Sequence, residues 1–447
     1  MMKDRDMTEL QNSYPAATHS LPGLSIDDRF SDLESLTLFL NGRGIETKNT
    51  RIDRYQKYLK IASDQGVDNV DHKSIFKNVT DGRFQHGLDW YLYVLREVDE
   101  LAHILNGLKV HVPNGIDERL KKIVGGSDFA ALDKNSESRN VQFELRIASY
   151  FCLAGFIVRL DTETDIIASR GRQHFYVECK RISNSKQLEE NLLKAKQQIL
   201  ARVPIKKRIL HKYYGVIAVD VTRVAYSHNG LTFGITNDHA REVVQSALRS
   251  ISEKIERIRF FSKKPPIIQC WLQIHIPGLI ESPPQAFTRF SSLFVVNSET
   301  AISCKAALLL LHNVYAGTDF SDPRESPSRK INTELNLPAG TQLWLSPNIS
   351  DLMFTAGDPK FYKSINEKSA DDFDKIAETL VGGIIIKGKE YDFSMIDLVA
   401  FLAKRPDGFV KQLCERLAED DDLKCRTELL CMLFLSKYPF YDSSSDE

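Results

Sequence analysis

The chain has 447 residues, of which 27% are charged and 42% hydrophobic, and its formal net charge is −1. This length suffices for two or three domains, and the composition is typical of a globular protein. A net charge near zero excludes a global positive field, so any contact with nucleic acid must come from local patches.

The seven cysteines are scattered, and no CxxC pair indicates a zinc site. Their odd number and their place in apolar runs favour reduced thiols in a cytoplasmic location. The longest apolar runs, such as Ala306–Leu311, are too short to cross a bilayer. We therefore expect a cytoplasmic protein that does not bind a membrane.

Residues 1–27 are polar and lack periodicity, which predicts a disordered N-terminus. From 28 to 130, apolar residues recur every three to four positions and predict a helical region. This region is either a recognition module or a helical cap on the next domain, and its aromatic stripe favours the cap. A stretch rich in Gly, Asp, Asn and Ser then predicts a loop before a domain at 139–315.

The first helix of this domain is predicted over Val141–Ala154, with an apolar stripe that includes Phe151. At about 100° per residue, Glu144 falls beside Phe151 at the edge of this stripe. We therefore expect Glu144 to lean toward the sheet.

Two strands that carry unusual charges follow, over Thr164–Ser169 and His174–Ile182. Asp165 enters the first strand ahead of three apolar residues. In the second strand both faces hold apolar residues, so Glu178 and Lys180 project from one face of a covered strand. Burying such charges is unfavourable unless they are paired or bind a charged partner.

The next predicted helix is Gln187–Ala201, with Leu188, Leu192, Ala195 and Ile199 turned inward. Lys194 and Gln198 lie along its flank.

The order Glu144, Asp165, Glu178-x-Lys180 and Gln198 resembles the PD-(D/E)XK superfamily of nucleases, which have the restriction-endonuclease-like fold. Thr164 stands where that family often has Pro. Four other (D/E)-x-K triples lie in polar or loop-like surroundings, at Glu46/Lys48, Asp71/Lys73, Asp358/Lys360 and Asp422/Lys424. The alternative is an ordinary α/β core whose charges pair with one another.

The resemblance implies that Asp165 and Glu178 hold Mg²⁺ or Mn²⁺, with the Cys179 carbonyl as a further ligand. Two carboxylates on adjacent strands form a hard-oxygen pair that suits these ions. Asp161 and Glu163 lie close by and are alternatives to Asp165.

The resemblance also implies catalytic roles for Lys180, Glu144 and Gln198. Lys180 would orient the attacking water or stabilise the developing charge. Glu144 would be an outer metal ligand, and Gln198, or Gln197 in the alternative register, would orient the groups around the metal.

A basic stretch follows this helix and is either a track for backbone phosphates or a solvated turn. With Lys194, the nucleic-acid-binding candidates are Lys206, Lys207, Arg208 and Lys212.

Helices and strands continue to alternate up to residue 315, which predicts an α/β fold with a mixed sheet flanked by helices. Asp220 is expected at a strand end, and we assign no role to His275. Residues 316–441 predict a C-terminal region of mixed α/β structure, and residues 442–447 a disordered tail.

We therefore expect a metal-dependent nuclease that hydrolyses phosphodiester bonds in DNA, with RNA as the alternative substrate. The resemblance implies a setting in bacterial defence or repair, as a homodimer or with a partner protein of the same system. The alternative is a catalytically silent member of this fold that binds nucleic acid or another protein.

Overall fold

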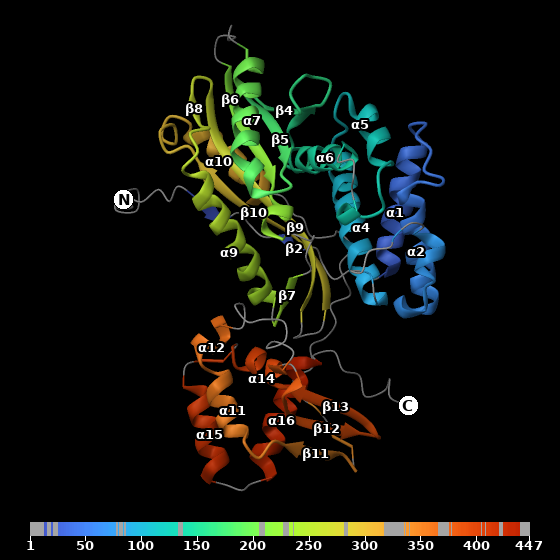
Figure 1. The fold of residues 1–447 in the computed structure, drawn as a ribbon, viewed down its shortest axis with the longest axis vertical. Helices are drawn as coiled ribbons and strands as arrows, with labels where there is room; N and C mark the ends of the chain where they lie inside the picture. The colour runs from blue at the N-terminus through green and yellow to red at the C-terminus, as the bar shows by residue number, and fades with distance from the viewer. Residues whose placement is uncertain are drawn as a thin grey trace. The chain divides into compact units, whose positions relative to one another are not determined.

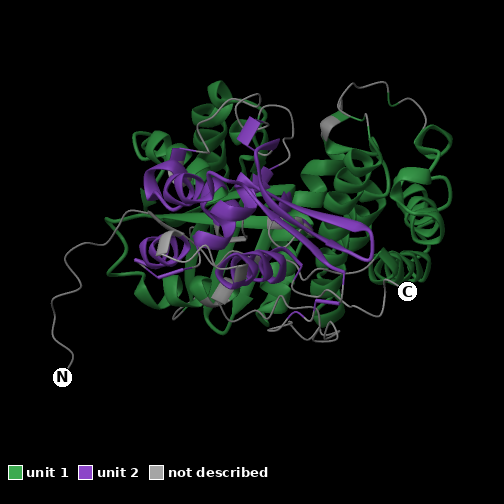
Figure 2. Ribbon diagram, turned by 90° about the horizontal axis from the view of Figure 1, so that it is seen from below, with its two compact units in different colours: residues 1–231, 244–278, 287–323 green, residues 232–243, 279–286, 324–447 purple. Residues whose placement is uncertain are grey.

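The computed structural model describes residues 13–15, 19–20, 26–76, 79, 84, 86–132, 137–204, 211–226, 232–235, 237–280, 285–316, 335, 337–338, 340–364, 375–376, 378–403, 405–406, 408–419 and 423–438. The chain divides into two compact units, which Figure 2 colours separately. Unit 1 comprises Met1–Leu231, Val244–Gly278 and Phe287–Pro323. Unit 2 comprises Thr232–Val243, Leu279–Ala286 and Arg324–Glu447.

A mixed sheet forms the centre of unit 1 (Figure 1). Its strands include β1 (Ser13–Pro15), β2 (His19–Ser20), β3 (Ile157–Arg159), β4 (Ile166–Arg170), β5 (Gln173–Arg181), β6 (Lys212–Asp220), β8 (Ser262–Lys263), β9 (Pro266–Ile280) and β10 (Gln285–Val296). The main path through the sheet is β1-β10-β9-β6-β5-β4-β3. β5, β6 and β9 run parallel, whereas β3, β4 and β5 pair antiparallel.

Helices lie on both faces of this sheet. The helices that begin in unit 1 or pack in its core are α1 (Ile26–Asn41), α2 (Arg51–Gln65), α3 (His72–Ile75), α4 (Gly87–Val110), α5 (Ile116–Ile123), α6 (Glu137–Leu153), α7 (Leu188–Arg202), α8 (Thr222–Ala225), α9 (Asn237–Ile255) and α10 (Lys305–Ala316). Val177 of β5 packs in the core that contains α6 and α10, whereas Tyr176 packs in the core that contains α7 and α9. The prediction of a mixed sheet flanked by helices is confirmed.

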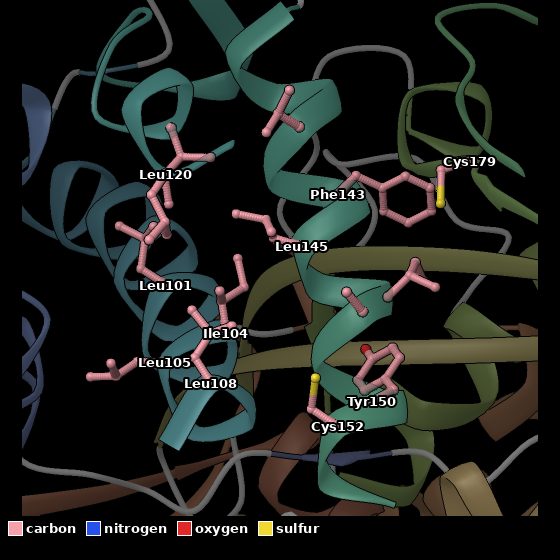
Figure 3. Close-up of a cluster of buried hydrophobic side chains, with 14 of the residues drawn as sticks. Leu101, Ile104, Leu105, Leu108, Leu120, Phe143, Leu145, Tyr150, Cys152 and Cys179 are labelled. Carbon is pink, nitrogen blue, oxygen red and sulfur yellow. The ribbon is translucent and has the colours of Figure 1, made fainter. Parts of the chain in front are cut away.

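Helix α6 joins the N-terminal helices to the sheet. Leu145 points toward α4, on the side where Ile104 lies, while Phe143 and Tyr150 project from other sides of α6 (Figure 3). The N-terminal helices therefore share one hydrophobic core with the sheet. Residues 28–130, which the sequence presents as a region of their own, lie within unit 1.

Two strands occur where the sequence predicts disorder. Within residues 1–27, β1 and β2 pair antiparallel with β10. An edge strand offers unpaired backbone groups, so this pairing needs no hydrophobic pattern that the sequence would reveal. The other residues before 26 and the predicted tail at 442–447 lie outside the described residues.

Unit 2 contains an antiparallel sheet of order β11-β12-β13. Its elements include β7 (Thr232–Gly234), β11 (Gln342–Leu345), α11 (Ile349–Ala356), α12 (Pro359–Ser364), β12 (Leu380–Ile386), β13 (Lys389–Ser394), α14 (Met395–Leu402), α15 (Phe409–Glu419) and α16 (Leu423–Lys437). Its hydrophobic core joins Ile384 of the sheet to Met353, Leu398 and Leu429 of three helices. The C-terminal region is therefore mixed α/β, in agreement with the prediction.

Candidate active site

Three charged side chains from adjacent strands meet at Lys180. Its Nζ lies 3.5 Å from Oε2 of Glu178 and 3.9 Å from Oδ2 of Asp165. In the antiparallel ladder Ile166 is opposite Val177, so Asp165 lies one residue before the ladder, level with Glu178. The carboxylate pair and the lysine that the sequence predicts are brought together.

Glu178 is a buried carboxylate with one unsatisfied oxygen. Its side chain is 0% exposed, and among the described residues Oε2 has no hydrogen-bond partner. Burial and the charge of Asp165 raise the pKa of Glu178, while Lys180 and Arg202 oppose this shift. A cation beside Oε2 would therefore stabilise the ionised carboxylate.

Arg202, the first cation of the basic stretch that the sequence analysis noted, belongs to this site, a role that the sequence did not indicate. Its Nη1 donates to Oε1 of Glu178 at 2.6 Å. Arg202 lies in the last turn of α7, and Leu192, Ala195 and Ile199 pack this helix into the core shared with the sheet. The available signal was its position four residues after Gln198, which places both side chains on one flank of the helix.

The backbone of β5 orients Asp165. The N–H of Cys179 donates to Oδ2 of Asp165 at 2.8 Å. The N–H and C=O of one strand residue point to the same side, so the Cys179 carbonyl faces the side on which Asp165 lies. Asp161 and Glu163 are exposed, and Asp161 pairs with Arg159 at 3.1 Å. Asp165 is therefore the carboxylate of this loop that reaches Lys180.

Glu144 of α6 has an ion-pair partner outside this group. Its carboxylate forms an ion pair with Arg119 of α5. Within the described part of the chain, no ion pair or hydrogen bond joins it to Asp165, Glu178 or Lys180. The reason is that α5, which the sequence does not predict as a separate helix, packs beside α6 and supplies a nearer cation.

Gln198 is the more buried of the two register alternatives. It is half-buried, and its Oε1 has no hydrogen-bond partner among the described residues, whereas Gln197 is exposed. Gln198 lies one turn before Arg202 on the same helix. Among the polar residues of α7, Gln198 is therefore the closest in sequence to Arg202, which binds Glu178.

Two of the five nucleic-acid-binding candidates lie in the described residues. Lys194 is exposed and pairs with Glu190 at 2.6 Å, and Lys212 is exposed at the start of β6. Surface ion pairs of this kind contribute little to stability. Lys206, Lys207 and Arg208 lie outside the described residues.

A second group of charges lies buried along α4, and the sequence analysis assigned it no role. Its members on that helix are Arg96, Glu97, Asp99, Glu100 and His103. Glu100 lies 3.0 Å from Nη1 of Arg146 on α6 and 3.4 Å from Nδ1 of His275 on β9. Charged residues on an otherwise apolar helix were the sequence signal that could have revealed this group. These contacts tie α4 and α6 to the sheet.

The residues around Lys180 fit a hard divalent cation. The described residues contain no group of three or more His, Cys, Asp and Glu arranged to hold a metal ion. Mg²⁺, however, keeps several waters and commonly takes only one or two carboxylates from a protein. The unsatisfied Oε2 of Glu178, the oriented carboxylate of Asp165 and the Cys179 carbonyl supply oxygen ligands of that kind.

No family model, curated protein or solved structure matches this chain. None of the described helices is long and apolar enough to cross a bilayer. The interpretation of the site therefore depends on its own geometry.

Proposed function

We propose that this chain is a metal-dependent nuclease of the PD-(D/E)XK superfamily, with a restriction-endonuclease-like fold, that hydrolyses phosphodiester bonds in DNA. One observation carries the proposal. Lys180 Nζ lies within 4 Å of two carboxylates from adjacent strands, at 3.5 Å and 3.9 Å, and one of them is a fully buried Glu. A cytoplasmic role in bacterial defence or repair is a further prediction from the resemblance.

The side chains divide the chemistry between them. Mg²⁺ or Mn²⁺ at Asp165 and Glu178 would lower the pKa of a water and neutralise charge on the phosphate. Lys180 would place its ammonium against the negative charge that develops on that phosphate. The Cys179 N–H fixes the Asp165 carboxylate, and Arg202 fixes that of Glu178.

A second function is favoured by a specific contact. Arg202 already neutralises Glu178 at 2.6 Å, and Arg119 pairs with Glu144. Glu178 and Glu144 therefore each have a cationic partner within the protein. The same pairing is expected of a core whose charged residues simply pair with one another. A catalytically silent member of the fold, which binds nucleic acid or a protein, would keep these pairs.

Cleavage of plasmid and oligonucleotide DNA by the purified protein tests the proposal, in Mg²⁺, in Mn²⁺ and in EDTA. The near-isosteric variants are Asp165→Asn, Glu178→Gln and Lys180→Met. Asp161→Asn is the matched control, because Asp161 lies in the same loop but is exposed and paired with Arg159. We expect metal-dependent cleavage that the first three variants lose and the control keeps.

Two outcomes would contradict the proposal in different ways. If the wild type binds DNA but does not cut it in either metal, the silent alternative is favoured. If cutting survives all three substitutions, the cleaving site lies elsewhere.

A further inference from the structure

A small polar pocket opens at the carboxyl ends of β5 and β6. Arg181 and Asp220 are the last residues of these parallel strands and are partners in the register. The pocket is small and is lined by Asn140, Arg181, Ile182, Ser183, Asp220 and Arg223. Crevices at the carboxyl ends of parallel strands are the usual ligand sites of α/β sheets.

The one carboxylate of this pocket is already satisfied. Oδ1 of Asp220 accepts from the N–H of Thr222 at 2.9 Å and from its Oγ1 at 2.6 Å. Oδ2 accepts from Nε of Arg181 at 3.3 Å. Asp220 therefore holds the wall of the pocket together and does not require an incoming cation.

The guanidinium groups of the pocket have donors to spare. A guanidinium has five N–H donors, and Asp220 takes only the one on Nε of Arg181. Arg223 is half-buried and has no ion pair or hydrogen bond to any described residue. Burial and the charges of Arg96 and Arg139 lower the pKa of Arg181, and Asp220 and Glu100 oppose them. Arg96 and Arg139 therefore add positive charge to that of Arg181 and Arg223, and Asp220 and Glu100 offset part of it. The spare guanidinium donors favour an anion as the ligand.

We propose that this pocket binds the phosphate group of a phosphomonoester, held by the guanidinium groups of Arg181 and Arg223. Planar guanidinium groups match tetrahedral oxyanions with paired hydrogen bonds, and two of them suit the double charge of a phosphomonoester. Asn140 and Ser183 also line the pocket. The phosphate is either the end of a nucleic-acid strand or a free phosphate or nucleotide.

This pocket is distinct from the candidate active site. Lys180 and Arg181 are consecutive in β5, so their side chains project from opposite faces of the sheet. A phosphate held by Arg181 therefore does not occupy the position between Asp165 and Glu178. The proposal does not rest on nuclease activity, and phosphate binding can be measured in EDTA.

The test is thermal unfolding of the whole protein in EDTA with increasing inorganic phosphate, against sodium chloride of equal ionic strength. We expect phosphate to raise the Tm of the wild type above the chloride control. Arg223→Ala should weaken the apparent phosphate affinity at least tenfold, and the half-exposed position lets this variant fold. Arg257→Ala is the matched control, because Arg257 is exposed and far from the pocket in sequence, and it should behave as the wild type.

Oligonucleotides with a 5′-phosphate, a 3′-phosphate or hydroxyl ends, and a nucleoside monophosphate, then distinguish the two sources. Tighter binding of a phosphorylated strand, lost in Arg223→Ala, identifies a strand end. Binding of the mononucleotide without a preference among the strands identifies a free phosphate. The proposal is overturned if phosphate stabilises the wild type no more than chloride does, or if Arg223→Ala binds phosphate as the wild type does.

Discussion

Arg202 donates to Oε1 of Glu178 at 2.6 Å and so ties the last turn of α7 to β5. The other oxygen of Glu178 is buried and has no hydrogen-bond partner among the described residues. The arginine therefore has two effects. It fixes the orientation of the carboxylate, and it supplies a positive charge that competes with a bound cation.

Replacing Arg202 by Met should expose both effects. Without divalent metal, we expect the free energy of unfolding to fall by about 2 kcal/mol, since a hydrogen bond to a charged group contributes roughly 1.5–3 kcal/mol. Mn²⁺ should then stabilise this variant more than it stabilises the wild type. Urea denaturation in EDTA measures the loss of stability, and denaturation in Mn²⁺ measures the stabilisation by the metal, with Arg257→Met as the control for each. Equal stabilisation by Mn²⁺ in variant and wild type would contradict the competition.

Lys180→Met separates chemistry from metal binding. The ammonium lies 3.5 Å from Glu178 and is placed to act on the substrate phosphate. Its loss should lower the cleavage rate by about 10²–10³-fold, which is typical for a group that stabilises developing charge. Mn²⁺ affinity should be kept or raised, because a competing cation is removed. Single-turnover experiments measure the cleavage rate, and a Mn²⁺ titration measures the metal affinity. Cleavage at the wild-type rate would refute the catalytic role of Lys180.

Gly215 of β6 controls how closely α7 approaches the sheet. A Cβ added there would lie 2.6 Å from Cγ2 of Ile199 and 2.9 Å from Cγ1 of Ile267. Gly215→Ala should therefore lower the free energy of unfolding by about 1–3 kcal/mol through overpacking. The loss should be smaller in an Ile199→Ala background, as a double-mutant cycle by chemical denaturation would show. An equal loss in both backgrounds would mean that this contact is not the cause.

Because of His275, we expect the free energy of unfolding to depend on pH. This histidine is fully buried, and burial and the charge of Arg96 lower its pKa from 6.5 to about 4, against the opposing charge of Glu100. Between these values the folded state binds fewer protons than the unfolded chain, so stability falls as the pH falls. The complete loss amounts to about 3 kcal/mol.

The contribution of His275 is isolated by comparison with His275→Gln. The difference in unfolding free energy between the wild type and this variant should change progressively from pH 7 to pH 4, in the direction that disfavours the wild type at low pH. A difference that stays constant over this range would show that another group titrates.

The local order of elements around the site follows from periodicity. Alternation in β5 correctly places Glu178 and Lys180 on one face, and the apolar residues around Asp165 indicate the adjacent strand. These are short-range patterns, in which each residue's face depends only on its own strand. The inward positions of Leu192, Ala195 and Ile199 on α7 follow in the same way from helical spacing.

The long-range partners did not follow from the sequence. Arg202 reaches Glu178 across 24 positions, and Arg119 takes Glu144 because α5 packs on α6. Glu100, Arg146 and His275 come from three separate elements and meet only in the folded core. No periodicity specifies which helix packs against which, so the choice of ion-pair partners and the strands β1 and β2 could not be predicted.

The most direct test of the central claim is a calorimetric Mn²⁺ titration of the wild type, Asp165→Asn, Glu178→Gln and the control Asp161→Asn. If Asp165 and Glu178 hold the metal, the wild type and Asp161→Asn will bind Mn²⁺ alike, and the other two variants will lose at least tenfold in affinity. Undiminished binding in Asp165→Asn and Glu178→Gln, or no binding by the wild type, would contradict the account.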